Sequence, residues 1–266
     1  MAKIGIVGLG VIGSAIKAGF EHLGHEIKVH DIRLETNIES VLDTQVCFIC
    51  VPTPSTENGE CNTSIVDSVV SELVALNYNG LISIKSTVSP GLVNSLSEKY
   101  NIKNISFVPE FLRERCAVED FIYNQDLCVL GVYSDSDYEL LKSIHGNLPK
   151  SFSKCTPIEA EFVKYFNNVY NATLITFANS FASVCESMGV DYSRVKEVAV
   201  QRNHIQDVYL NSSNEVRGFG GMCLPKDTNA FNHLAKSVDN LNISFFEDII
   251  KQNDEFQVTV FKGMRK

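Results

Sequence analysis

A glycine-rich turn near the amino terminus constrains the fold of this chain more than any other feature. The motif Gly8-Leu-Gly10-Val-Ile-Gly13 directly follows a short apolar run and opens a helical pattern, and Asp31 ends the next apolar run. Such glycines allow a tight turn and let the backbone approach a pyrophosphate at the helix N-terminus, and the acid accepts hydrogen bonds from an adenosine ribose. The motif therefore predicts a dinucleotide site, with a structural turn beside a solvated acid as the alternative.

Two residues of the same region bear on which dinucleotide binds. A carboxylate at Asp31 would repel the 2′-phosphate of NADP, so it favours NAD. Arg33, two residues later, keeps NADP open as the minor alternative.

The first half of the chain alternates short apolar runs with helical patterns, which is typical of an α/β fold with a doubly wound parallel sheet. Strands are expected at Lys3–Val7, Ile27–His30, Val46–Val51, Leu81–Ile84, Ile105–Val108 and Leu127–Val132, and helices near 11–24, 63–77, 90–100 and 135–146. The strand pattern stops after Pro149. We therefore expect a Rossmann-type NAD-binding domain over residues 1–150.

The remaining residues, 151–266, carry helical patterns and predict an all-helical central domain. Thr156-Pro-Ile-Glu159 combines an N-cap hydroxyl, a first-turn proline and a capping-box glutamate. Apolar residues then recur at helical spacing as far as Met188, giving a helix of about thirty residues, roughly 45 Å long. Such a helix is more typical of a dimer or interdomain spine than of a surface element, so we expect a homodimer. Shorter helices are expected near 192–200, 225–238 and 244–262.

Composition and charge exclude several classes of protein. With 23 Lys and Arg against 32 Asp and Glu, the formal net charge is −9, so we expect no nucleic-acid or anionic-membrane surface. Glycines interrupt the amino-terminal apolar stretch, which resembles neither a signal peptide nor a membrane span, and we expect a cytosolic protein. Eight cysteines are scattered without metal-ligand spacing, so we expect reduced thiols and no metal.

Polar and proline residues close two predicted strands at the edge where ligands bind in this fold. Val51-Pro52-Thr53-Pro54 ends the third strand, and Lys85-Ser-Thr-Val-Ser-Pro-Gly91 ends the fourth, with Thr87 at its tip. A cofactor or substrate contact and ordinary turn chemistry are both open here.

Two carboxylates follow the fifth strand. Glu110 and Glu114 lie four residues apart, so a helical turn would put both on one face, over the nicotinamide side of the sheet. Paired carboxylates can order a water or act as a base. A solvated charge cluster with Arg113 and Arg115 is the alternative.

Lys164, Asn168 and Asn171 form a polar stripe on the long helix, opposite the face of Phe162 and Phe166. Periodicity alone favours the solvated side of an amphipathic helix. A functional interpretation requires a cleft above the stripe, where a lysine and an amide could hold an oxyanion.

The most specific segment is Gly218-Phe-Gly-Gly-Met-Cys223-Leu-Pro-Lys226-Asp227. Its glycines let backbone amides approach a ligand, and a helix beginning at Cys223 would favour the thiolate through its N-terminal dipole and Lys226. A buried structural cysteine is the alternative, and it is the preferred interpretation for the other seven.

These blocks, in this order, resemble the UDP-glucose/GDP-mannose dehydrogenase family: GLGVIG, VPTP, KSTVSPG, VPEFLRE, the Lys164/Asn168 pair and GFGGMCLPKD. The resemblance runs over essentially the whole chain, and its last block is highly specific. Family enzymes oxidise the C6 alcohol of a nucleotide sugar to a carboxylate with two NAD, without releasing the aldehyde.

The resemblance implies a role for each matching position. The implied catalytic set is Thr87, Glu110, Glu114, Lys164, Asn168, Cys223 and Asp227, and the implied NAD contacts are Gly8, Gly10, Val11, Ile12, Gly13, Asp31, Arg33, Val51, Pro52, Thr53, Thr87 and Glu114. Cys223 would capture the aldehyde as a thiohemiacetal and retain the oxidised product as a thioester. Lys164 and Asn168 would stabilise the oxyanion, and Glu110 or Asp227 would assist the hydrolytic water. Glu110 and Glu114 would be acid/base and substrate-loop groups, and Thr87 a water-holding or cofactor-side hydroxyl.

Two features depart from the family pattern. Val11-Ile12 stands where the family usually has an aromatic-aliphatic pair, which affects packing more than chemistry. Family members also continue into a second Rossmann-like domain that binds the nucleotide of the substrate, whereas this chain ends at Lys266, just after Asn253-Asp-Glu-Phe-Gln257, which resembles the start of that domain. We therefore expect the base and ribose site to be absent, in a fragment or in a naturally short form.

Two other functions stay open. A β-hydroxyacid-type NAD dehydrogenase shares the two domains and the Lys/Asn pair but needs no cysteine. A cofactor-binding module would have lost turnover together with the third domain.

Overall fold

The computed structural model describes residues 1–213, 215 and 217–256, which fall into two compact units. The first unit comprises Met1–Pro54 and Asn62–Lys164, and the second comprises Ser55–Cys61 and Tyr165–Lys266. The division lies within one long helix, α6 (Pro157–Ser187), and each unit is described separately. The predicted domain boundary after residue 150 stays a prediction.

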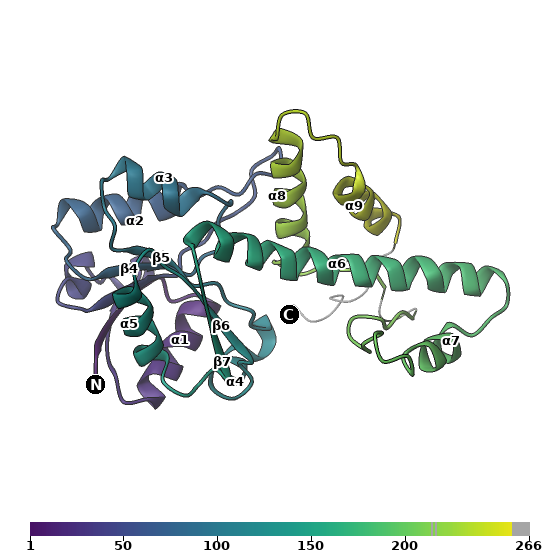
Figure 1. Cartoon of the computed structure of the whole chain (residues 1–266), viewed down its shortest axis with the longest axis horizontal. Helices are drawn as coiled ribbons and strands as arrows, with labels where there is room; N and C mark the ends of the chain where they lie inside the picture. Colours follow the sequence, from purple (N-terminus) through teal and green to yellow (C-terminus); the bar gives the residue numbers. More distant parts are fainter. Residues whose placement is uncertain (214, 216, 257–266) are drawn as a thin grey trace. The chain divides into compact units, whose positions relative to one another are not determined.

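A seven-stranded sheet forms the centre of the first unit (Figure 1). Its order is β2-β1-β3-β4-β5-β6-β7, with β1 (Lys3–Val7), β2 (Glu26–His30), β3 (Val46–Ile49), β4 (Leu81–Ile84), β5 (Ile105–Phe107), β6 (Leu127–Gly131) and β7 (Ser151–Cys155). The pairs among β1 to β5 are parallel, and β2 and β3 lie on opposite sides of β1. The predicted α/β fold with a doubly wound sheet is confirmed, and ligands of such sheets bind beyond the carboxyl ends of the strands at the point where the order reverses.

Helices cover both faces of this sheet, and each face has its own apolar core (Figure 1). α2 (Ser64–Ala75) and α3 (Leu92–Lys99) pack on one face, and α1 (Val11–His22), α4 (Ala117–Tyr123) and α5 (Asp135–His145) pack on the other. Successive side chains of a strand point to opposite faces. Phe48 of β3 accordingly stacks on Phe20 of α1, whereas Ile49 lies in the opposite core.

Two expectations for the edge of the sheet are wrong, and one helix on a face of the sheet was not foreseen. β6 pairs antiparallel with β5, β7 is a strand beyond Pro149 where none was expected, and α4 was not foreseen. β7 lies at the sheet edge and is largely exposed, so it carries no apolar run that periodicity could detect. α4 has only seven residues, which is too short for a helical period to show.

The described part of the second unit is helical, as predicted. Besides α6 from Tyr165 onward it contains α7 (Tyr192–Ala199), α8 (Leu224–Ser237) and α9 (Phe245–Glu255). The prediction of one helix of about thirty residues is confirmed by α6, which has 31. The predicted continuation of the last helix from 257 to 262 lies outside the described residues.

Small apolar clusters hold the second unit together. One joins Cys61, Tyr165 and Ala230, and another joins Ala172 of α6 to Phe219 and Ile249. These contacts tie α8 and the loop before it to α6, and they position the residues discussed below.

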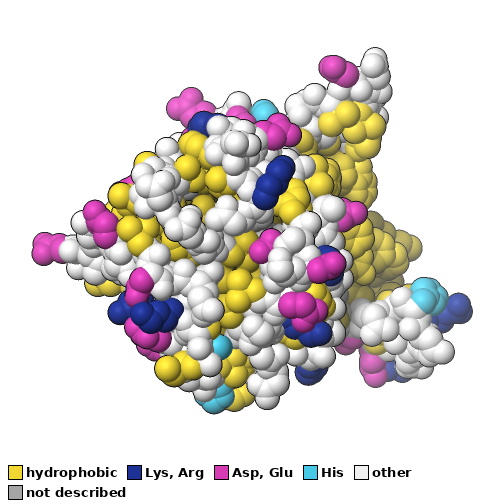
Figure 2. Space-filling view, turned by 60° about the vertical axis from the view of Figure 1, so that its left-hand side comes forward, with side chains coloured by type: hydrophobic (Ala, Val, Ile, Leu, Met, Phe, Trp, Pro, Cys, Tyr) yellow, Lys and Arg dark blue, Asp and Glu magenta, His cyan; other side chains and the backbone are white. Residues whose placement is uncertain are grey.

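The face seen in Figure 2 carries acidic and basic side chains interspersed rather than gathered by sign. No single-sign patch therefore stands out on this face. Among the described helices, none combines the length and the apolarity needed to cross a bilayer.

Candidate active site

The glycine motif lies in the first unit, where β1 ends and α1 begins. Gly8 has a φ of +92°, which residues with a Cβ rarely adopt, and a Cβ at Gly13 would lie 1.9 Å from the Gly8 carbonyl oxygen. Gly10 is the N-cap of α1, and a Cβ there would meet no atom within 4 Å. Open space thus faces the helix N-terminus, and the turn fits the pyrophosphate of a dinucleotide. Of the two intervening residues, Val11 is exposed and Ile12 packs against the core.

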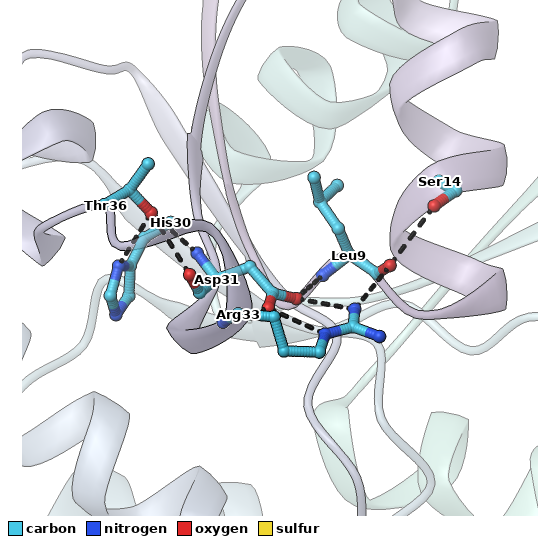
Figure 3. A network of polar contacts seen from close by, with 6 residues as sticks. All are labelled: Leu9, Ser14, His30, Asp31, Arg33 and Thr36. Atoms are coloured by element: carbon cyan, nitrogen blue, oxygen red, sulfur yellow. Dashed lines mark hydrogen bonds and ion pairs between the residues drawn. The ribbon is translucent and has the colours of Figure 1, made fainter.

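Asp31 directly follows β2, and its carboxylate is buried beside this turn (Figure 3). Oδ2 accepts hydrogen bonds from the Leu9 N–H at 2.6 Å and from Nη2 of Arg33 at 2.9 Å. Oδ1 accepts hydrogen bonds from the Arg33 backbone N–H at 2.8 Å and from its Nε at 2.9 Å. The Arg33 hydrogen bonds, which outweigh the effect of burial, hold the pKa of Asp31 well below its usual value. The group is therefore an anion at neutral pH.

The loops that follow β3 and β4 are hydrogen-bonded to each other. Thr53 Oγ1 donates to the Thr87 carbonyl oxygen at 2.7 Å, and Ser86 Oγ donates to the Val51 carbonyl oxygen at 2.7 Å. Thr53 is buried, and Pro52 beside it is exposed. The structure thus brings Val51, Thr53 and Thr87 together at the carboxyl edge of the sheet, where they were expected.

Glu110 and Lys164 form a buried ion pair, also in the first unit. Lys164 Nζ donates to the Glu110 carbonyl oxygen at 2.6 Å and to Oε1 at 3.0 Å, and the Leu112 N–H donates to Oε2 at 2.8 Å. Burial raises the pKa of Glu110, but the Lys164 charge and these hydrogen bonds outweigh it and bring the pKa below its usual value. Glu110 is therefore a carboxylate at neutral pH, able to accept a proton.

The expected pairing of Glu110 with Glu114 on one helical face is wrong. The backbone between them is irregular, and Glu114 is an exposed residue at the start of a three-residue 3₁₀ helix. Asp120 of α4 accepts hydrogen bonds from the Arg113 N–H at 3.0 Å and from its Nε at 2.9 Å. These bonds hold Arg113 extended, so no helical turn forms before Glu114.

The expectation that the polar stripe of α6 is its solvated side is also wrong. Lys164 and Asn168 are only 4% and 5% exposed, whereas Phe166 is 75% exposed. The helix therefore buries Lys164 and Asn168, leaves Asn171 partly buried, and exposes aromatic side chains at the surface. Burial excludes the solvated-side interpretation for Lys164 and Asn168, and the functional interpretation of the stripe stays a prediction.

Asn168 and Asp227 contact each other in the second unit. Asn168 Nδ2 donates to Asp227 Oδ2 at 2.5 Å, and Lys226 Nζ lies 2.8 Å from Oδ1 of the same carboxylate. Asp227 is fully buried. Asn168 and Asp227, two members of the predicted catalytic set, are thus neighbours in space although 59 positions separate them in the sequence.

Cys223 is exposed at the N-cap of α8, as the motif predicts. The Asp227 N–H donates to the Cys223 carbonyl oxygen at 2.8 Å, which closes the first turn of the helix. A buried structural role is therefore excluded for this cysteine. Accessible thiols at helix N-termini are the type that react as nucleophiles.

Two buried amides fix the loop that leads to Cys223. Asn179 Oδ1 accepts a hydrogen bond from the Gly218 N–H at 3.2 Å, and Asn253 Oδ1 accepts one from the Phe219 N–H at 2.7 Å. Gly218 and Gly221 have φ values of +66° and +82°, which explains the need for glycine there. Sequence reasoning missed both asparagines, because nothing near them in the sequence indicates a loop so far away.

Two buried charged residues of the first unit were also missed. Glu161 accepts hydrogen bonds from the Gly91 N–H at 2.6 Å and the Val93 N–H at 2.9 Å, and so caps α3 from another helix. Lys85 follows β4 and donates from Nζ to the Val108 carbonyl oxygen at 3.2 Å, and burial lowers its pKa. A signal for Glu161 exists, since it precedes Lys164 by three residues on the same inward stripe of α6.

Glu161→Gln is expected to make the free energy of unfolding less dependent on pH. Burial raises the pKa of Glu161 from 4.5 to about 7, against the two backbone hydrogen bonds. Between these values the folded protein retains a proton that the unfolded chain has released, so the wild type loses stability as pH rises, by up to about 3 kcal/mol. Urea unfolding followed by circular dichroism measures this slope from pH 5 to 7.

The matched control is Glu98→Gln, which changes an exposed glutamate of α3. This variant should keep the wild-type slope. If Glu161→Gln keeps it as well, Glu161 does not titrate in this range.

Two family models match the chain. The model described as "UDP-glucose/GDP-mannose dehydrogenase family, NAD binding domain" matches residues 30–149, and the model of the central domain of the same family matches residues 158–255.

The chain is also similar in sequence to named dehydrogenases of this family. The UDP-glucose 6-dehydrogenase of Rickettsia bellii is 35% identical over 225 residues, which cover 82% of this chain and 51% of the relative. The GDP-mannose 6-dehydrogenase of Pseudomonas aeruginosa is 32% identical over 219 residues, with 76% and 49% covered. The chain thus spans about half the length of these relatives. The solved structure of a UDP-glucose dehydrogenase from Pyrobaculum islandicum matches with a TM-score of 0.88 at 28% identity, covering 96% of this chain and 68% of that one.

Proposed function

The chain belongs to the UDP-glucose/GDP-mannose dehydrogenase family, and we propose that it carries the NAD-binding and catalytic residues of a nucleotide-sugar 6-dehydrogenase. The proposed reaction oxidises the C6 alcohol of a UDP-glucose-like nucleotide sugar to the carboxylate in two steps. The observation that supports the proposal is Cys223, an exposed thiol at the N-terminus of α8. Asp227, one turn further along α8, accepts a hydrogen bond from Asn168 of α6.

NAD, when bound, supplies the hydride acceptor for both oxidations. The glycine turn would hold its pyrophosphate through backbone N–H groups at the start of α1, and Asp31 would accept hydrogen bonds from its adenosine ribose. We propose that Val51, Pro52, Thr53 and Thr87 at the strand tips contact the cofactor as well. The hydrogen bonds from Thr53 to the Thr87 carbonyl and from Ser86 to the Val51 carbonyl hold the two loops together.

The first oxidation removes the hydroxyl proton and the C6 hydride and leaves an aldehyde. A base must accept the proton, and the Lys164 ion pair keeps Glu110 in the carboxylate form that can do so. Thr87 is proposed as a water-holding or cofactor-side hydroxyl. Glu114 is exposed, so its proposed role as a substrate-loop group depends on substrate reaching that surface.

In the second step the Cys223 thiolate bonds to the aldehyde carbon, and the carbonyl oxygen becomes an alkoxide. Lys164 and Asn168, four residues apart on α6, are proposed to donate hydrogen bonds to this oxyanion. Loss of the second hydride from C6 re-forms the carbonyl and leaves a thioester on Cys223. Water then adds, with Glu110 or Asp227 accepting its proton, the C–S bond breaks, and Cys223 leaves as the thiolate while the sugar carboxylate forms.

NADH formation tests the proposal. UDP-glucose and GDP-mannose would each be supplied with NAD to this chain alone, and then with a separately expressed polypeptide covering the part of a relative that the chain does not span. Remote binding energy contributes to turnover, so we expect weak activity alone and higher activity with the added part. NAD binding without NADH under either condition would favour a cofactor-binding module instead.

Wild-type protein is expected to bind NAD at least about tenfold more tightly than NADP, a difference of about 1.4 kcal/mol. The buried Asp31 anion should repel a 2′-phosphate, and Asp31→Ala should lose most of the difference, chiefly by weakening NAD binding. Titration calorimetry measures both dissociation constants. Asp43→Ala, which removes an exposed acid paired with Lys3, is the matched control and should keep the preference. Equal affinity of the wild type for the two cofactors would contradict the assignment.

We also propose a homodimer that forms through α6. Its exposed side in the second unit carries large apolar side chains at Phe166, Tyr170, Phe177, Phe181 and Val184, and the exposed Met188 follows the helix directly. Contiguous apolar surfaces of this kind are typical of protein interfaces. A cytosolic location stays a prediction.

A further inference from the structure

The carboxylate proposed to receive the adenosine ribose is already fully hydrogen-bonded (Figure 3). An ionised carboxylate offers about four acceptor sites. On Asp31 four donors fill them: the backbone N–H groups of Leu9 and Arg33, and the Nε and Nη2 atoms of the Arg33 side chain. No acceptor site is left for a ribose hydroxyl while the Arg33 side chain stays in this position.

The Arg33 side chain gives each oxygen of Asp31 one hydrogen bond. Nε donates to Oδ1 and Nη2 donates to Oδ2, both at 2.9 Å. Two adjacent hydroxyls of a ribose could donate in the same pattern, one to each oxygen. The guanidinium therefore occupies the acceptor sites that a ribose diol needs.

The two hydrogen bonds from the Arg33 side chain can be replaced by bonds from a ribose while the backbone hydrogen bonds that fix Asp31 remain. The Arg33 side chain is 66% exposed, and Nη2 also donates a hydrogen bond to the Leu9 carbonyl oxygen at 2.9 Å. Only the guanidinium of this pair is solvent-exposed, so it can exchange the buried carboxylate for water, and another hydrogen-bond donor can take its place. Asp31 itself is fixed by its backbone, since its N–H donates to Thr36 Oγ1 at 2.9 Å. Displacing the guanidinium would leave the Leu9 and Arg33 N–H groups on the carboxylate.

We propose that Arg33 is a specificity-determining residue that competes with the adenosine ribose for Asp31. NAD binds only in the fraction of molecules in which the guanidinium has moved away, which lowers its apparent affinity. The displaced cation stays near the ribose, where it attracts a 2′-phosphate and narrows the preference for NAD over NADP. The inference rests on the proposed function only in that NAD is the cofactor.

Titration calorimetry with ADP-ribose and with 2′-phospho-ADP-ribose tests this competition on the full chain. Arg33→Met keeps the aliphatic stem and removes the guanidinium. We expect it to bind ADP-ribose about 3- to 10-fold more tightly than the wild type and to bind the 2′-phosphorylated analogue more weakly. Arg33→Lys, which retains the charge but not the two-donor fork, should tighten ADP-ribose binding less.

The matched control is Lys3→Met, which removes another exposed cation paired with an aspartate, at the amino end of β1. It should change neither dissociation constant. Circular dichroism and thermal unfolding establish whether each variant is folded. If Arg33→Met does not fold, Arg33→Lys serves as the test.

Equal or weaker binding of ADP-ribose by folded Arg33→Met, or no binding by any of the proteins, would overturn the proposal. ADP-ribose carries no nicotinamide, so its binding does not depend on hydride transfer. A wild type that binds ADP-ribose but forms no NADH from any nucleotide sugar would refute the proposed function and leave the competition at Asp31 intact.

Discussion

Replacing Cys223 with serine is expected to abolish complete oxidation of the nucleotide sugar. The variant should form no uronate and at most a slow first NADH, because an ester of serine forms and breaks less readily than a thioester. Intact-mass spectrometry should show either a sugar adduct that persists on the protein or no adduct at all. Undiminished NADH production would exclude the cysteine mechanism and favour a dehydrogenase of the β-hydroxyacid type.

Cys155→Ser is the matched control for this experiment. Cys155 is a half-buried residue of β7, where burial raises the pKa of its thiol to about 11. Its thiol is therefore protonated at neutral pH, and the variant should retain wild-type turnover.

Lys164→Met is expected to reduce both stability and turnover. The substitution leaves the Glu110 carboxylate buried without its cationic partner, which costs about 3 to 5 kcal/mol of the free energy of unfolding. Loss of a proposed oxyanion donor should also lower kcat about a hundredfold or more. Urea unfolding followed by circular dichroism, and initial rates of NADH formation, measure the two effects.

Glu110→Gln and the double variant complete a thermodynamic cycle for this pair. Removing the carboxylate charge should restore part of the stability lost in Lys164→Met, because the penalty comes from the unpaired charge. Strictly additive losses would show that the two groups do not interact in the folded protein.

The central part of the fold could be predicted because its signals are local. A glycine turn between an apolar run and a helical pattern fixes β1, α1 and the carboxyl edge of the sheet, and the capping box at Thr156 fixes the start of α6. β7 gave no such signal, because an exposed edge strand needs no apolar side chains.

The orientation of α6 could not be predicted from periodicity. The pattern distinguishes an apolar face from a polar one but does not say which face other elements cover. Here the covered side carries Lys164 and Asn168, and Phe166 is exposed. An aromatic face that remains exposed in one chain is a reason to expect a partner there.

The candidate site could be predicted at motif positions but not in its supporting contacts. Cys223 and Asp227 lie in one contiguous segment, so their chemistry is visible in the sequence. Asn253 and Phe219, by contrast, are hydrogen-bonded although 34 positions separate them in the sequence. The carboxylate of Asp31 is hydrogen-bonded to Arg33, which the sequence suggested only as a contact to NADP. Such pairings depend on tertiary packing, which a single sequence does not specify.

The amount of NADH formed per uronate decides whether these residues perform a two-step oxidation. The chain would be mixed with NAD and limiting nucleotide sugar, with the separately expressed remainder of a relative present, and both products would be quantified at completion. We expect two NADH for each uronate and no released aldehyde. One NADH per sugar with a released carbonyl product, or no NADH although NAD binds, would contradict the proposed mechanism.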